Sequence, residues 1–168
     1  QAITVKTRPG DNLMVHKAVD IAQPGDVLVV NTGYNYTNAP WGELLTLACS
    51  KKGIAGLVID GVVRDAAALR TLDFPVFCAG FAANGCDKDG PGEVNTVISC
   101  GGVTIHPGDI ILADDDGVVC VPLDLVEKTI KETLEKVDQE NVRRKEIEDG
   151  IIVKADIDNT LRKLGIIQ

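Results

Sequence analysis

Short runs of β-branched residues alternate with segments of helical periodicity, and this alternation constrains the fold of the chain most. Ile3 to Lys6 and Val27 to Asn31 are typical of strands, and Asn12 to Ala22 between them carries apolar residues at helical spacing. A second helix is predicted over Trp41 to Lys52, followed by an apolar strand over Gly56 to Asp60. The pattern predicts an α/β fold in which helices cover buried strands.

The next stretch continues this pattern and then changes. A short helix over Asp65 to Thr71 and a strand over Val76 to Ala79 are predicted first. Four short strands separated by Gly- and Asp-rich turns should follow, which favours a β-meander or part of a barrel; they are Val94 to Ser99, Gly102 to Ile105, Ile110 to Ala113 and Val118 to Val121. We therefore expect a mixed sheet or barrel-like β core.

The carboxyl-terminal part should be helical. Leu125 to Gly150 reads as one long charged helix with a narrow apolar face, and Asp156 to Leu164 as a second helical piece. The 168 residues, 45% of them hydrophobic but only 4% aromatic, suit one domain with an aliphatic core. We expect a single domain over residues 1–168, with the helical tail starting at about 125.

Charge and cysteine usage narrow the classes of function and the compartment. A net charge of −8, with no basic run longer than Arg143-Arg144-Lys145, argues against nucleic-acid binding. Apolar stretches are too short for a membrane span, so no membrane partner is expected. The five cysteines are scattered without a Cys-x-x-Cys pair, which favours reduced thiols and a cytoplasmic location.

The first candidate site is the segment Asn38 to Leu45. If a helix starts near Pro40 or Trp41, the N–H groups of Gly42 to Leu45 lack partners within it and could bind a carboxylate. Gly42 would let a ligand approach the backbone closely. The alternative is an ordinary helix start at which Glu43 favours the helix dipole.

The second candidate site is the segment Asp60 to Asp65, at the end of an apolar strand. Ligands of α/β proteins bind beyond the carboxyl ends of strands. Arg64 offers a planar fork for a carboxylate or enolate oxygen, and Asp65 offers an oxygen ligand for magnesium or manganese. The alternative is a local ion pair in which Asp65 caps the following helix.

Other polar features favour structural roles. The acidic stretch Asp114 to Gly117 lacks the further ligands of a calcium loop and reads as a hairpin turn. His16 and His106 lie outside any metal-ligand spacing and are expected to be structural or surface residues. The segment Lys88 to Glu93 is interpreted as a turn that could border a site.

Several stretches, taken in order, resemble one family. They are Gly25 to Val30, Gly42 to Leu45, Gly53 to Asp65, Phe74 to Phe77, Gly101 to Val103, Pro107 to Asp109 and Ala113 to Val118. The chain resembles the RraA-like family and, within it, the class II 4-hydroxy-4-methyl-2-oxoglutarate aldolases. The resemblance runs from about Thr4 to Gly150 and implies the family's swivelling β/β/α fold.

The resemblance implies roles for individual residues. Asp65 would bind a divalent metal, Mg²⁺ or Mn²⁺, directly, and Glu43 would hold it through water. Arg64 would bind substrate, and the amides of Gly42, Glu43, Leu44 and Leu45 would receive the substrate carboxylate. Glu140, contributed by the carboxyl-terminal helix of a neighbouring subunit, best matches a further acidic position that acts through water. Aldolases of the family more often carry Asp where this chain has Glu43.

The activity implied is cleavage of 4-hydroxy-4-methyl-2-oxoglutarate, and of 4-carboxy-4-hydroxy-2-oxoadipate, to pyruvate and a keto acid through a metal-stabilised enolate. A water linked to the metal is expected to act as the base, and oxaloacetate decarboxylation should accompany the cleavage. The resemblance also implies a homotrimer or homohexamer. The alternatives are a non-catalytic regulator of RNase activity, against which the retained Asp65 argues, and a scaffold with a vestigial site.

Overall fold

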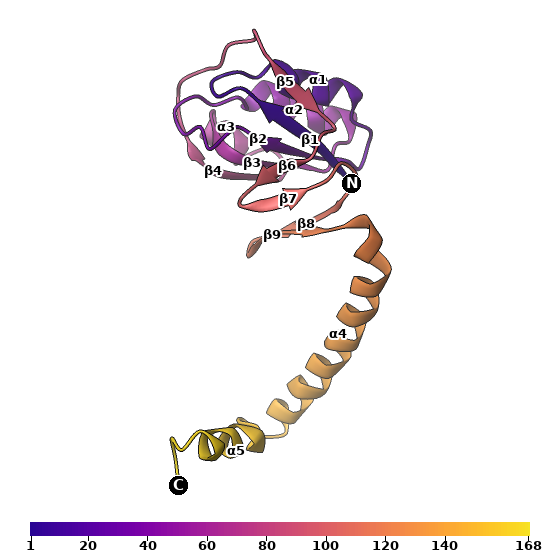
Figure 1. Ribbon diagram of the computed structural model, residues 1–168, viewed down its shortest axis with the longest axis vertical. Helices are drawn as coiled ribbons and strands as arrows, with labels where there is room; N and C mark the ends of the chain where they lie inside the picture. Colours follow the sequence, from indigo (N-terminus) through magenta and orange to yellow (C-terminus); the bar gives the residue numbers. More distant parts are fainter. The chain divides into compact units, whose positions relative to one another are not determined.

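The computed structural model describes residues 1–168, apart from the side chain of Ala155. Contacts divide the chain into two units, Gln1–Leu125 and Val126–Gln168. A five-stranded mixed sheet forms the centre of the first unit, in the order β4-β3-β2-β1-β5 (Figure 1). Its strands are β1 (Ala2–Thr7), β2 (Val27–Asn31), β3 (Gly56–Val63), β4 (Val76–Phe81) and β5 (Gly92–Val94).

Strands β1 to β4 are parallel, and only β5 runs antiparallel, beside β1. This arrangement confirms the predicted α/β fold and the mixed sheet. Every residue of β3 is buried, and its sequence is apolar except for Asp60. The strand was predicted to end at Asp60 but continues to Val63. Its pairing with β4 shifts register between Ile59 and Val62.

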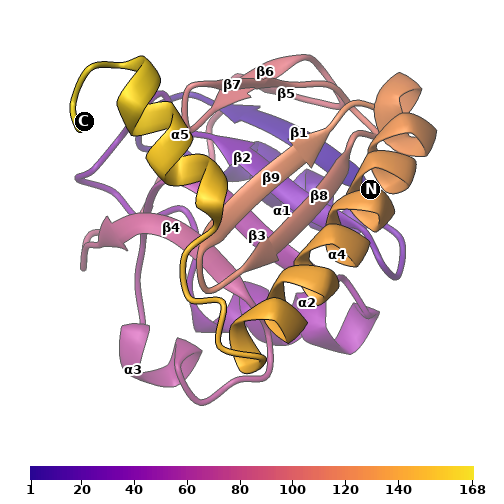
Figure 2. The same cartoon turned by 90° about the horizontal axis from the view of Figure 1, so that it is seen from below.

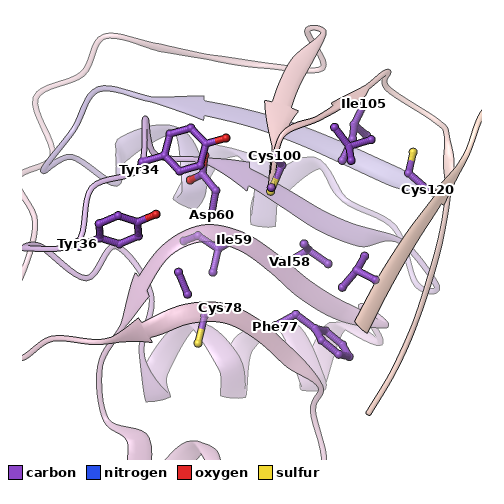
Figure 3. Close-up of a pocket in the computed structure, with 14 residues that line it drawn as sticks. Tyr34, Tyr36, Val58, Ile59, Asp60, Phe77, Cys78, Cys100, Ile105 and Cys120 are labelled. Atoms are coloured by element: carbon purple, nitrogen blue, oxygen red, sulfur yellow. The ribbon is translucent and has the colours of Figure 1, made fainter. Parts of the chain in front are cut away.

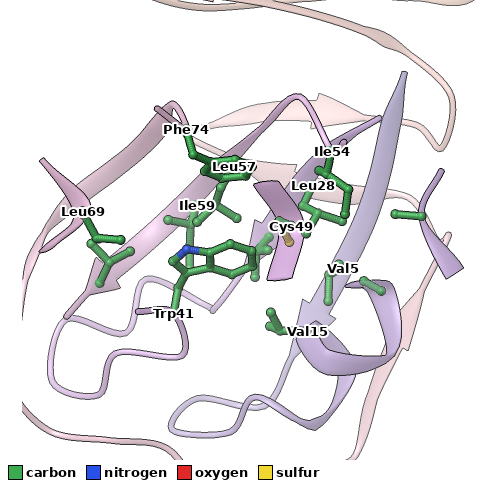
Figure 4. Packing of buried hydrophobic residues seen from close by; sticks show 14 residues of the cluster. Val5, Val15, Leu28, Trp41, Cys49, Ile54, Leu57, Ile59, Leu69 and Phe74 are labelled. Carbon is green, nitrogen blue, oxygen red and sulfur yellow. The ribbon is translucent and has the colours of Figure 1, made fainter. Parts of the chain in front are cut away.

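Three helices pack on one face of this sheet: α1 (Leu13–Ile21), α2 (Glu43–Lys52) and α3 (Ala66–Leu69). The core between them and the strands is aliphatic, as predicted, except for Trp41 and Phe74, whose rings stack at 6.3 Å (Figure 4). Helix α2 ends at Gly53, whose φ of 81° is the left-handed conformation that glycine adopts most easily.

Two β-hairpins cover the opposite face. They are β6 (Ile98–Cys100) with β7 (Val103–Ile105), and β8 (Ile110–Asp114) with β9 (Gly117–Val121). Ile98, Cys100 and Ile105 pack there on Val29 and Val58 of the sheet. Figure 2 shows hairpin β8–β9 in front of strands β1 to β3.

Strands β6 to β9 do not form the predicted continuous meander or barrel, because they pair as two separate hairpins. The single strand predicted over Val94 to Ser99 is wrong. Asn95 has a φ of 56°, which breaks the extended chain, so that Val94 ends β5 on the main sheet and Ile98 begins β6. The predicted hairpin turn at Asp114 to Gly117 is confirmed by the pairing of these two residues.

The second unit consists of α4 (Val126–Glu148) and α5 (Ala155–Lys163), as the helical periodicity predicts. A short 3-10 turn, Leu123–Leu125, precedes α4 at the end of the first unit. Arg143 of α4 donates hydrogen bonds to the carbonyls of Ile151 and Ile152, in the connection between the two helices. In the described chain, no helix combines the length and apolar character needed to cross a membrane.

Candidate functional site

The two candidate segments of the sequence meet in the structure. Trp41 pairs with Val63 as in a parallel ladder, and the N–H of Arg64 donates to the carbonyl of Trp41 at 2.9 Å. A helix start at Pro40 or Trp41 is therefore wrong, because the backbone of Trp41 is extended beside β3. Helix α2 begins at Glu43, after Gly42 with φ −167° and ψ −165°.

Asp65 and Arg64 lie against the first turn of α2. Asp65 Oδ2 accepts a hydrogen bond from the N–H of Glu43 at 3.0 Å and lies 3.7 Å from Nε of Arg64. Both side chains are 40% exposed, so they are accessible to a ligand. The alternative interpretation predicted an ion pair between Arg64 and Asp65, and this pair is present. It also predicted that Asp65 caps α3, but the side chain of Asp65 makes no hydrogen bond to the start of that helix.

Gly42 makes this contact possible. A Cβ atom at position 42 would overlap Oδ2 of Asp65 and would lie 2.9 Å from Cγ of Arg64. The backbone of Gly42 is extended, in a conformation open to any residue, so the requirement for glycine here comes from space and not from φ. Arg64 and Asp65 occupy the volume that a side chain at this position would fill.

The first turn of α2 also presents free backbone donors. The first regular helical hydrogen bond runs from the N–H of Thr46 to the carbonyl of Gly42. The N–H groups of Leu44 and Leu45 therefore have no acceptor within the helix and carry the positive end of its dipole. The hydrogen bond from the N–H of Glu43 to Asp65 holds this turn beside the segment that bears Arg64 and Asp65.

A third segment, which sequence reasoning missed, borders Arg64. The N–H of Ala39 donates to the carbonyl of Asn84 at 2.8 Å, and Nδ2 of Asn38 donates to the carbonyl of Gly85 at 2.8 Å. These bonds hold Gly85 so that a Cβ on it would lie 3.0 Å from Nη1 of Arg64. The Gly- and Asn-rich composition of residues 84–86 predicts a loop, but no sequence pattern predicts that this loop lies beside Arg64.

The donors for a metal ion are few within one chain. Among the described residues, no three His, Cys, Asp or Glu side chains gather closely enough to hold a metal ion. Mg²⁺ is commonly bound by one or two carboxylates together with water and substrate oxygens. The half-exposed carboxylate of Asp65 fits this mode of binding, and Glu43, whose N–H donates to Asp65, is the first residue of the adjacent helix.

The remaining predicted residues lie elsewhere. Glu140 belongs to α4 in the second unit, so its role remains a prediction. His16 is exposed on α1, and His106 is exposed with Nδ1 3.7 Å from Asp109, which confirms them as surface residues. The predicted turn over Lys88 to Glu93 is a loop only as far as Pro91, because Gly92 and Glu93 belong to β5. The N–H groups of Asp89 and Gly90 in this loop donate to Asp11.

Comparison with known proteins shows the family to which this fold belongs. The family model described as RraA-like, Aldolase/RraA, matches residues 1–120. The chain belongs to the RraA-like family.

Individual relatives carry different names. The chain is 40% identical over 151 residues to a protein of Halalkalibacterium halodurans named "Putative 4-hydroxy-4-methyl-2-oxoglutarate aldolase", covering 90% of this chain and 72% of that protein. A solved structure described as the RNA-processing inhibitor RraA from Thermus thermophilis is 32% identical, with a TM-score of 0.68 over 72% of this chain and 73% of that one. An uncharacterized protein from Pseudomonas syringae is 27% identical, with a TM-score of 0.80 over 89% of this chain and 70% of that one.

Proposed function

We propose that the protein is a divalent-metal-dependent lyase that cleaves 4-hydroxy-4-methyl-2-oxoglutarate, and also 4-carboxy-4-hydroxy-2-oxoadipate, to pyruvate and a second keto acid. The observation that carries the proposal is the contact of Arg64 and Asp65 with the first turn of α2, where Gly42 leaves room for both. The relative named as an aldolase supports the same reaction class.

The substrate carboxylate binds at the start of α2. The N–H groups of Leu44 and Leu45 have no acceptor within the helix, and the helix dipole favours a negative charge there. Glu43 uses its own N–H on Asp65, so the two following amides are the donors left for substrate. Gly42 leaves the room in which Asp65 and Arg64 lie beside this turn.

Arg64 stabilises the negative charge that develops on the keto oxygen when the carbon–carbon bond breaks. Its guanidinium is always charged and offers several N–H donors in a fixed plane. The contact of Nε with Asp65 and the neighbouring Gly85 restrict the orientations open to the side chain. A donor held ready in this way lowers the energy of the transition state without reorganisation.

Asp65 would hold the divalent ion directly, and Glu43 would hold it through water. Mg²⁺ or Mn²⁺ bound there would supply a Lewis acid that polarises the keto carbonyl. Asp65 contributes one oxygen to the N–H of Glu43, which orients its carboxylate, and is exposed enough to bind an ion. The same chemistry would serve the decarboxylation of oxaloacetate, which we propose as a side activity.

We also propose that the active protein is a homotrimer or homohexamer, with Glu140 of one subunit completing the site of another. Asp65 and Glu43 would supply one or two carboxylates from one chain, and a carboxylate of a neighbouring subunit would add a further water-mediated ligand. The protein would act in the cytoplasm on a small keto acid.

A second candidate function is regulation of an RNase without catalysis. The similarity to a structure described as an RNA-processing inhibitor favours it. Such a role would need neither Asp65 nor the free amides of α2. Tight binding to an RNase together with an absence of metal-dependent turnover would support this second function.

The test is a coupled assay of pyruvate release from 4-hydroxy-4-methyl-2-oxoglutarate and from oxaloacetate. Chelated protein should be inactive, and added Mg²⁺ or Mn²⁺ should restore turnover. Asp65→Ala should abolish the restored activity, whereas Asp73→Ala, which removes an exposed carboxylate later in the same connection, should retain it. Metal-independent turnover, or full activity of Asp65→Ala, would reject the proposal.

A further inference from the structure

A separate cavity lies on the sheet face opposite α2. Its volume is about 340 Å³, and neither Arg64 nor Asp65 lines it. The side chains of its walls are mainly apolar and come from the sheet and from hairpins β6–β7 and β8–β9; they include Val58, Phe77, Cys100, Ile105, Val118 and Cys120. Figure 3 shows Tyr34, Tyr36 and Asp60 gathered at one end of the cavity, with Ile105 and Cys120 at the other.

Asp60 is the charged residue of this cavity. Its side chain comes from β3 on the same face as Val58, and the residue is only 6% exposed. Oδ1 accepts hydrogen bonds from the N–H of Thr32 at 2.6 Å and from its hydroxyl at 2.8 Å. Oδ2 is buried and has no hydrogen-bond partner among the residues described by the structure.

A buried carboxylate oxygen without a donor costs free energy, so the site favours a ligand that supplies one. The nearby thiol of Cys100 does not donate a hydrogen bond to Oδ2, because it donates to the carbonyl of Val30 instead, with Sγ 3.7 Å from that oxygen. Burial and the charge of Asp60 raise the pKa of Cys100 to about 12, which keeps this thiol protonated. Among the described residues that line the cavity, Asp60 is the one with an acidic side chain.

Two tyrosines line the end of the cavity at which Asp60 lies. Tyr34 and Tyr36 are 47% and 55% exposed, so their side chains can rotate to admit a ligand. Thr32 connects the loop of the two tyrosines to Asp60. Its hydroxyl donates a hydrogen bond to Asp60 and accepts one from the N–H of Asn35 at 3.2 Å. Aromatic faces beside a carboxylate attract cations, through the ring quadrupole and through the opposite charge.

We propose that this cavity binds a small organic ammonium ion with a compact apolar body. Its N–H groups would donate to Oδ2 of Asp60, its charge would face Tyr34 and Tyr36, and its apolar body would fill the space toward Ile105. The volume suits a ligand of about the size of an arylalkylamine, near the lower end of the range for small-molecule pockets. The net charge of −8 favours the approach of a cation.

The test compares phenethylammonium with its neutral isostere 2-phenylethanol, by calorimetry and by chemical-shift changes of the whole protein. Phenethylammonium should bind at least about tenfold more tightly than the alcohol. Asp60→Asn should remove most of this preference. The variant should still fold, because the amide oxygen can accept the two bonds from Thr32 while the amide nitrogen replaces the unpartnered oxygen.

The comparison of the two probes on the unaltered protein needs no variant, and Tyr34→Leu gives a second variant if Asp60→Asn fails to fold. Asp73→Asn, which changes an exposed carboxylate, is the matched control and should leave binding unchanged. Equal binding of amine and alcohol, absence of amine binding, or unchanged binding by Asp60→Asn would overturn the proposal. A loss of amine binding as the protein self-associates would assign the cavity to a second copy of the chain and would also overturn it. These readouts do not depend on turnover, so they stand apart from the lyase proposal.

Discussion

The carboxylate of Asp65 accepts a hydrogen bond from the backbone N–H of Glu43, 22 positions earlier in the chain. The bond joins the end of β3 to the start of α2, so two segments that look unrelated in the sequence form one surface. It also leaves the next two amides of α2 as the free donors of that surface. The proposed lyase activity depends on this contact.

Replacing Gly42 by Ala should disable the site while leaving the fold intact. The added methyl group would overlap Oδ2 of Asp65 and press on Cγ of Arg64. Both side chains are partly exposed and can move aside, so the melting temperature should change little. Displacements of about 1 Å commonly reduce rates about 100-fold, and we expect a loss of this order in kcat/KM for pyruvate release. Gly80→Ala, whose Cβ would meet only ordinary contacts, should retain activity; similar kcat/KM values for the two variants would contradict the geometry.

Arg64→Lys should lower kcat/KM although it preserves the charge, because Arg64 is proposed to stabilise charge that develops in the transition state. A lysine loses the planar fork and with it one charge-assisted hydrogen bond to the developing enolate oxygen, which corresponds to about a 10- to 100-fold decrease in kcat/KM. Steady-state kinetics with 4-hydroxy-4-methyl-2-oxoglutarate measure this change. Arg70→Lys, which alters an arginine stacked 5.5 Å from the ring centre of Phe81, serves as the control. A kcat/KM unchanged by Arg64→Lys would remove Arg64 from the proposed substrate site.

Glu140→Ala should lower turnover, and mixing should show whether Glu140 acts between subunits. Chains carrying Glu140→Ala should have reduced activity alone, and chains carrying Asp65→Asn should have none. If the residues act across an interface, random reassembly should restore activity at about a quarter of the sites. Glu135→Ala, on the same helix, is the control. No recovery after verified mixing would place Glu140 outside the site or in the same chain as Asp65.

Stability at low pH should depend on Asp11. Burial opposes ionisation of this carboxyl, but N–H donors of Leu13, Asp89 and Gly90 and the side chain of Arg8 outweigh it and lower its pKa from 3.8 to about 2. Because the folded-state pKa is the lower one, the stabilisation is present above pH 4 and is lost as pH falls toward 2. Urea unfolding from pH 6 to pH 2 should show a smaller pH dependence for Asp11→Asn than for Asp73→Asn. Equal pH dependence would contradict this role.

Much of the fold follows from local patterns. Val27 to Asn31 and the end of α2 at Gly53 agree with the structure because β-branched runs and a left-handed glycine are determined by neighbouring residues. The predicted strand Val94 to Ser99 failed because Asn95 turns the chain and sends its two halves to different sheets. No local pattern distinguishes that break from a continuous strand.

The candidate site was predictable only in part, for a similar reason. Arg64, Asp65 and Glu43 occupy strand-to-helix junctions, which the alternation of elements predicts to lie at one edge of the sheet. The extended pairing of Trp41 with Val63 and the approach of Gly85 to Arg64 depend on contacts between distant loops. The unpartnered oxygen of Asp60 likewise depends on where hairpin β6–β7 covers the sheet.

Binding of Mn²⁺, followed by electron paramagnetic resonance of the free ion, tests the central claim most directly, because it requires no turnover. The unaltered protein should bind about one Mn²⁺ per chain, and oxalate, an analogue of the pyruvate enolate, should tighten this binding. Asp65→Asn should weaken Mn²⁺ binding by at least about tenfold, whereas Asp73→Asn should bind normally. Binding of Mn²⁺ that is equally strong with Asp65→Asn, or unaffected by oxalate, would contradict a metal and keto acid site at Asp65 and Arg64.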